Sequence, residues 1–333
     1  MLTDEATLDA FDSLLHVLFS VQGQLKQNSL QMMETQMSAL SLSEEGPAFW
    51  SQFDGIIKEI SKQTTVFAMA FDKPPVPEGQ AAVKLVEQVQ TPVVALSKLF
   101  HDNLARAFCT FGGLCMQQVV KRSLEIVKAL CDLVIAVKSR KPSLQLRSTG
   151  TLWELCDGMA GLPRNNPAAF QVASLQSIRL VQDAIEELQE SSQLLQEKDA
   201  KILSCCLALA KCTKASIQKV SQSVAISVKP DLLSNSAAVS SIDRFGECAE
   251  KLSPAVDDMA AAFYLTQESE SPNDVRDELV TESDRLSQLV LQLLDVFHNS
   301  HWYCVERDAQ RTEILRKVPA HNVDKLRALL VNE

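Results

Sequence analysis

Apolar residues return every three or four positions along almost the whole chain, and this spacing constrains the fold more than any other feature. The first segment is typical, with a stripe formed by Leu8, Phe11, Leu14, Leu15, Leu18, Val21 and Leu25. Residues at this spacing share one face of an α-helix, so each such segment needs other helices to cover it. Only 10 glycines and 12 prolines interrupt the 333 residues, and the strand-favouring Tyr and Trp number 2 and 3. The sequence therefore predicts an all-α fold with no sheet.

Glycine and proline mark the expected ends of these helices. The segment DKPPVPEG at 72–79 ends one helix, because proline lacks the N–H that a helix interior needs. Gly112-Gly113 either breaks a helix or lets two backbones approach closely. Helix starts are predicted where a capping side chain precedes proline, at Asn166-Pro167, Ser253-Pro254 and Ser271-Pro272. A turn is predicted at Lys198–Lys201, and a last break between Lys317 and Val323.

The length suggests two domains. The residues SRKPS at 139–143 close one helix and open an expected loop to about Gly150. We place the domain boundary there, with an N-terminal helical bundle over 1–150 and a C-terminal helical bundle over 151–333. The expected architecture is two helical-bundle lobes linked by long helices.

Leucines recur every seven residues in the C-terminal half, at Leu279, Leu286 and Leu293. This pattern is typical either of an intermolecular zipper or of a seam inside one bundle. It spans fewer than the ~3–4 heptads that indicate a coiled coil, so we favour the seam.

The chain is acidic, with 32 basic and 42 acidic residues and a net charge of -10. Most of the excess lies between Asp243 and Asp284, either as a solvated helix face, which we favour, or as a surface that meets a basic partner. Because phosphate contacts dominate nucleic-acid binding, the absence of a basic stripe predicts no direct nucleic-acid partner. Apolar runs such as Leu133 to Val137 are far shorter than the ~18 residues that a membrane span needs, which predicts no membrane span.

Cysteine and histidine are the candidate reactive residues. The nine cysteines are odd in number and irregular in spacing, which predicts reduced thiols in the cytosol or nucleus. Cys205, Cys206 and Cys212 match no usual metal spacing, and we expect them in the core. His298, His301 and Cys304 share one helix face, but a metal would need a fourth ligand from elsewhere, and ordinary polar roles are favoured.

No phosphate-binding loop, dinucleotide motif, zinc-protease motif or nucleophile elbow occurs in the sequence. We therefore predict no enzyme activity, no catalytic, cofactor-binding or metal site and no cofactor. The sequence assigns no residues to partner binding.

Four segments, in this order along the chain, resemble the family of cyclin-D-binding proteins, also called GCIP. They are VFAMAFDKPPVPEGQAAVKLVEQV (66–89), LPRNNPAAF (162–170), CLALAKCTKASIQKV (206–220) and LSPAVDDMAAAFY (252–264). The resemblance implies an all-helical regulator in the cytoplasm and nucleus that binds D-type cyclins. It further implies helix-loop-helix transcription factors as partners and a restraint on cell-cycle progression and transcription.

Two departures from the family concern partner contacts. Vertebrate relatives carry a long acidic insertion where this chain has only a few residues between Glu197 and Ile202, and the segment after Ser287 matches poorly. The alternative is a cytoskeletal adaptor of the vinculin or α-catenin kind, which are also arrays of helical bundles, and this rests on analogy of fold alone.

Overall fold

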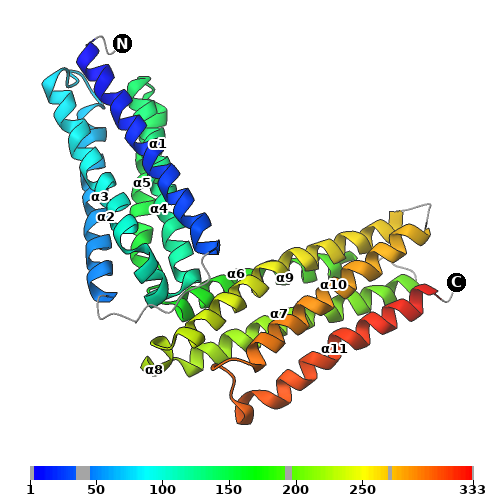
Figure 1. Ribbon diagram of the computed structural model, residues 1–333. Coiled ribbons are helices and arrows are strands. Elements are labelled where there is room, and N and C mark those ends of the chain that lie inside the picture. The colour runs from blue at the N-terminus through cyan, green and yellow to red at the C-terminus, as the bar shows by residue number, and fades with distance from the viewer. Residues whose placement is uncertain (1–3, 35–45, 192–196, 269–271, 332–333) are drawn as a thin grey trace. The chain divides into compact units, whose positions relative to one another are not determined.

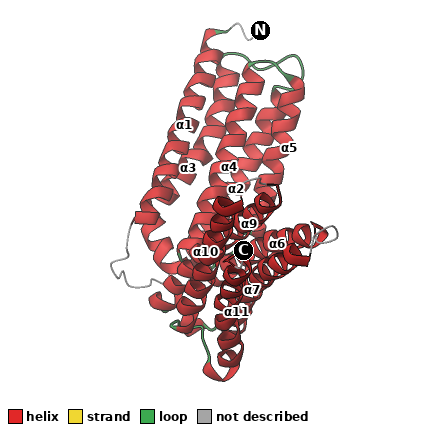
Figure 2. Ribbon diagram, turned by 90° about the vertical axis from the view of Figure 1, so that its right-hand side faces the viewer, coloured by secondary structure: helices red, strands yellow, loops and turns green. Residues whose placement is uncertain are grey.

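The structure, a computed structural model, describes residues 4–34, 46–191, 197–268 and 272–331. Over these residues it contains eleven α-helices, one short 3-10 helix and no strand (Figure 2). The all-α prediction is confirmed. No helix within the described ranges is long and apolar enough to cross a membrane.

Packing divides the chain into two compact units, Met1–Arg164 and Asn165–Glu333 (Figure 1). Unit 1 contains α1 (Glu5–Glu34), α2 (Gly46–Ala70), α3 (Gln80–Phe111), α4 (Gly113–Lys138), α5 (Pro142–Gly158) and η1 (Met159–Gly161). Unit 2 contains α6 (Asn166–Glu190), α7 (Glu197–Ser227), α8 (Pro230–Leu233), α9 (Ser236–Glu268), α10 (Pro272–His298) and α11 (Val305–Val331).

The division falls after Arg164, whereas the sequence placed it near Gly150, which lies inside α5. The loop expected over 139–150 is wrong beyond Lys141, because Pro142 fits the first turn of a helix, where its missing N–H has no partner to lose. The expected long linking helix is also wrong, since η1 and residues 162–165 join the units.

Unit 1 is built around the apolar stripe of α1. Phe11, Leu14, Leu18, Val21 and Leu25 are all buried, as the periodicity predicts, and α1 packs against α3 and α4. The remaining sides are closed by α2 against α3 and by α5 against α4 and α2. Aromatic rings fill both ends of this core, with Phe11, Phe67 and Phe71 at one and Phe49, Phe53, Phe100 and Phe111 at the other.

Unit 2 places α9 between α6 and α10, and α7 against α6 and α11. The heptad residues Leu279, Leu286 and Leu293 are fully buried along α10. They pack within the same unit, so the seam interpretation is confirmed and the leucines are not free to form a zipper with a second chain.

Two helices of unit 2 continue through a proline where a break or a start was predicted. Pro254 lies inside α9 and Pro319 inside α11, so both expected breaks are wrong. An interior proline costs a helix about 3 kcal/mol. Leu252 and Val256 on either side of Pro254 are fully buried, and their packing keeps α9 continuous across it.

Two further ends differ from the prediction by a few residues. Lys198–Lys201 is helical, because α7 already begins at Glu197, and Lys201 pairs with Glu197 at 2.8 Å one turn away. The expected N-cap Asn166 is buried inside the first turn of α6, and Asn165 caps the helix by accepting a hydrogen bond from the Ala168 N–H at 2.9 Å.

Other ends follow the sequence. The 72–79 segment separates α2 from α3, and Gly112 separates α3 from α4 at a φ of 90°, a conformation that favours glycine. Helix α10 begins at Pro272 as predicted, while Ser271, its expected cap, lies outside the described residues.

Candidate functional site

The cysteine thiols are the first candidates for chemistry, and the structure places them in the core. Cys205, Cys206 and Cys212 are buried along α7, as the sequence predicts. Burial raises the pKa of Cys206 to about 12 and that of Cys212 to about 11. A nucleophilic cysteine needs a lowered pKa, so these thiols have the properties of packing residues.

The predicted histidine group does not form a metal site. His298 ends α10, and its ring packs edge-on against Tyr303 with centroids 4.6 Å apart. The Cys304 thiol donates instead to a carboxylate oxygen of Glu306 at 3.1 Å. Across the described ranges, no three side chains of His, Cys, Asp or Glu come together as metal ligands.

A buried ionic cluster in unit 2 centres on Asp308 of α11, which has no exposed surface. Its carboxylate accepts hydrogen bonds from Lys219 Nζ at 2.6 Å, Ser223 Oγ at 3.0 Å and the Cys304 N–H at 2.8 Å, and from two guanidinium nitrogens of Arg307, each at 2.8 Å. Burial alone would raise the pKa of Asp308, but these donors outweigh it and hold the pKa well below its usual range. The donors bind α7 to α11, so the cluster is a structural joint.

The cluster was missed from the sequence because Lys219 and Asp308 are 89 residues apart. The sequence does show that Asp308 lies in the first turn of α11. Acids are common on the surface of a first turn, so this position did not indicate a buried cluster.

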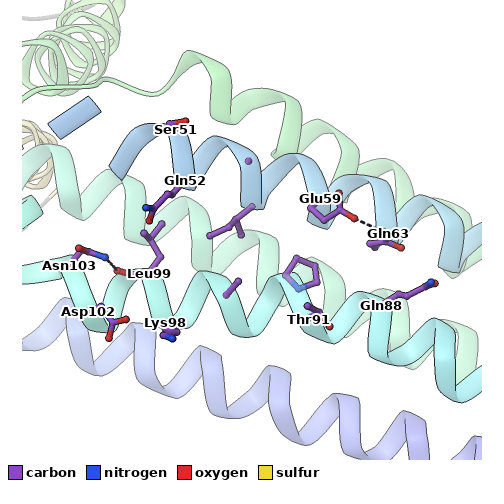
Figure 3. A pocket seen from close by; sticks show the side chains of 14 residues that line it. Ser51, Gln52, Glu59, Gln63, Gln88, Thr91, Lys98, Leu99, Asp102 and Asn103 are labelled. Carbon is purple, nitrogen blue, oxygen red and sulfur yellow. Dashed lines mark hydrogen bonds between the residues drawn. The ribbon is translucent and has the colours of Figure 1, made fainter. Parts of the chain in front are cut away.

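A groove between α2 and α3 on unit 1 has a volume of about 690 Å³ (Figure 3). Small and apolar residues form its floor, namely Gly55, Ile56, Pro92, Ala95 and Leu99. Polar side chains stand along its rim, including Glu59, Gln63, Gln88, Lys98 and Asp102, and the Gln63 amide donates to Glu59 at 2.5 Å. The rim charges are mixed in sign, so the groove offers an apolar contact without a strong charge preference.

A second surface on unit 1 follows the junction of α2 and α5. We call it the α2–α5 strip and define it by four exposed apolar side chains, Val66, Met69, Leu146 and Trp153. Soluble proteins seldom leave adjoining large apolar side chains uncovered without a binding role. The strip could not be predicted from the sequence, because residues 139–150 were expected to form a loop and a loop has no periodic apolar face.

These features define a class: an all-helical bundle protein whose described residues include exposed apolar surfaces on unit 1. Residues 52–194 match the family model described as Grap2 and cyclin-D-interacting, N-terminal.

Curated relatives extend the match over most of the chain. The chain is 26% identical over 308 residues to the Cyclin-D1-binding protein 1 homolog of Danio rerio, covering 85% of this chain and 86% of the relative. It is 25% identical over 312 residues to the homolog of Xenopus laevis, covering 85% and 89%. It is 25% identical over 370 residues to Cyclin-D1-binding protein 1 of Bos taurus, covering 99% and 96%. These matches confirm the resemblance to the cyclin-D-binding family and support that family for this chain.

Proposed function

We propose that this protein is a non-enzymatic regulator that binds D-type cyclins and thereby restrains cell-cycle progression. The observation that carries the proposal is the similarity to proteins named for binding cyclin D1, which extends over 85% to 99% of the chain.

A direct binding measurement with the purified full chain tests this proposal. We expect a D-type cyclin to bind with a Kd below about 10 μM, which corresponds to roughly −7 kcal/mol. An A-type cyclin serves as the specificity control. Titration calorimetry that detects no heat of binding at tens of micromolar D-type cyclin would refute the proposal.

The cellular part of the proposal concerns location and effect. We propose that the protein acts in the cytoplasm and nucleus, with helix-loop-helix transcription factors as further partners and without direct contact to nucleic acid or membrane. Overexpression is expected to lower the fraction of cells entering S phase, and imaging of a tagged chain gives its location. Unchanged S-phase entry at high expression would contradict the restraining role.

The helical bundles alone would also fit the alternative, a cytoskeletal adaptor. Co-sedimentation with actin filaments separates the two proposals, because an adaptor of the vinculin kind binds filaments and a cyclin regulator stays in solution.

A further inference from the structure

The α2–α5 strip contains the two most exposed large apolar side chains found on the described residues. Leu146 is 74% exposed and Met69 is 73% exposed, and Val66 and Trp153 follow at 43% and 41%. Water contact with side chains of this size is unfavourable, so covering them would stabilise a complex.

Two hydrogen bonds fix the strip as one surface. The Gln145 amide donates to the Ala68 carbonyl oxygen at 2.8 Å, and the Trp153 indole N–H donates to Thr65 Oγ1 at 2.8 Å. These bonds hold α5 antiparallel to α2 and place Leu146 and Met69, each next to a bonded residue, at the same end of the junction. Leu146 and Trp153 are seven residues apart and share one helix face.

Gly150 lies on that face between Leu146 and Trp153. A Cβ at this position would meet no atom of another element within 4 Å, so the space beside Gly150 is open, and we call this opening the notch. The indole of Trp153, three residues further along the same helix face, is held by its bond to Thr65. Tryptophan is enriched among the few residues that carry most of the binding energy in protein interfaces.

The charge around the Leu146 end of the strip differs in sign from the protein as a whole. Between Asp132 and Glu154 every charged residue is basic, and Arg140, Lys141 and Arg147 are exposed. Lys73, just beyond the C-terminal end of α2, adds one cation at this end. The acids near this end are Asp72 beside Lys73 and Asp12 of α1, which pairs with Lys138 just before α5. Glu154, Asp157 and the Glu59–Lys62 pair, which spans 3.5 Å, lie toward the Trp153 end.

We propose that the α2–α5 strip docks an amphipathic helix of another protein, one with an apolar stripe flanked by carboxylates. The apolar stripe covers Leu146 and Met69 and places one side chain in the notch at Gly150. The carboxylates lie toward Arg140, Lys141 and Arg147, where charge complementarity fixes the direction of the helix. The inference goes beyond cyclin binding and does not depend on it.

The probe is a designed peptide of about 18 residues, long enough to form a helix, with leucines at helical spacing and glutamates on both flanks. A second peptide carries lysine in place of every glutamate. Binding of each peptide to the full chain is measured by fluorescence anisotropy. We expect the acidic peptide to bind and the basic peptide to bind at least about tenfold more weakly, because its charges meet Arg140 and Arg147.

Variants of the strip locate the site. Leu146→Ser and Gly150→Leu are each expected to weaken the acidic peptide about tenfold, the first by removing an anchor and the second by filling the notch. Their controls are Phe19→Ser, a side chain 54% exposed on α1 of the same unit, and Gly23→Leu, also at an open helical position. Each substituted position is exposed or half-buried, so each variant is expected to fold, which circular dichroism checks.

Three results would overturn the proposal. The acidic peptide would fail to bind the wild-type chain at hundreds of micromolar, or it would bind the strip variants and the controls equally. Alternatively, the chain would bind vesicles of phosphatidylserine and phosphatidylcholine and lose this binding on Leu146→Ser, which would assign the strip to a membrane surface. The peptide assay contains no cyclin, so these failures are distinct from failure of the proposed function.

Discussion

The buried cluster around Asp308 provides the sharpest test of how unit 2 is held together. We predict that Asp308→Ala lowers the free energy of unfolding by about 3–5 kcal/mol, the range found when one partner of a buried ion pair is removed. The structure supports this range because the carboxylate is fully buried and Lys219, whose side chain is 10% exposed, would be left without its anion. The lost hydrogen bonds from Ser223 and the Cys304 N–H act in the same direction.

The effect has a defined dependence on pH. The pKa of Asp308 in the folded protein lies below its ordinary value of 3.8, so the unfolded chain takes up the proton first as pH falls. Ionised Asp308 therefore contributes its full stabilisation above about pH 5 and loses it progressively below about pH 4. The difference in stability between the wild type and Asp308→Ala is expected to shrink between pH 5 and pH 3.

Urea unfolding of the full chain, followed by circular dichroism at pH 7 and pH 3, measures both quantities. The matched control is Asp324→Ala on the same helix, since Asp324 is 74% exposed and its pair with Arg327 spans 3.5 Å. An exposed pair of this kind contributes at most about 1 kcal/mol. If Asp308→Ala costs less than Asp324→Ala, or costs as much at pH 3 as at pH 7, the cluster does not hold α7 to α11 as we argue.

Four further predictions follow from burial and helix geometry. Leu286→Asp buries an unpaired charge in the α10 seam and should lower the melting temperature sharply, with a loss of several kcal/mol in urea unfolding. Gly150→Ala should stabilise α5 by about 0.5–1 kcal/mol in the same assay, because the added methyl meets no other atom within 4 Å. Asn166→Ala should lower the free energy of unfolding by about 1–3 kcal/mol, because the Asn166 amide donates to the Val239 carbonyl and to Asp243. Asn165→Ala should lower it by only about 1 kcal/mol, because Asn165 caps the helix with one hydrogen bond. Native-state labelling with a thiol reagent should modify Cys304 first, because the other eight thiols are buried.

The fold class could be predicted from the sequence because the residues that recur at helical spacing are the ones that other helices bury. Leu14 and Leu18 recur at helical spacing, and both are fully buried. Helix ends were predicted less accurately where the prediction depended on a proline. Pro254 resembles a helix start because proline has no N–H to donate. Whether α9 continues through it depends on how the neighbouring residues pack against other helices, and those helices are distant in sequence.

The exposed apolar surfaces of unit 1 could not be predicted from the sequence for a related reason. Periodicity shows that a helix has an apolar face, but it does not show which apolar residues a neighbouring helix fails to cover. On α5, Leu152 is fully buried while Leu146 is largely exposed, and only the positions of α2 and α4 distinguish them. The Asp308 cluster is hidden in the same way, since its partners come from α7.

The α2–α5 strip also changes what the net charge implies about partners. A total of -10 describes the field far from the protein, where all charges contribute. A docked helix lies within a few ångströms of its neighbours, and at physiological salt charges beyond about 8 Å are largely screened. At that range Arg140, Lys141 and Arg147 act on the partner far more than any charge beyond this distance. An acidic protein can therefore select an acidic helix, and the excess of carboxylates between Asp243 and Asp284 does not by itself require a basic partner.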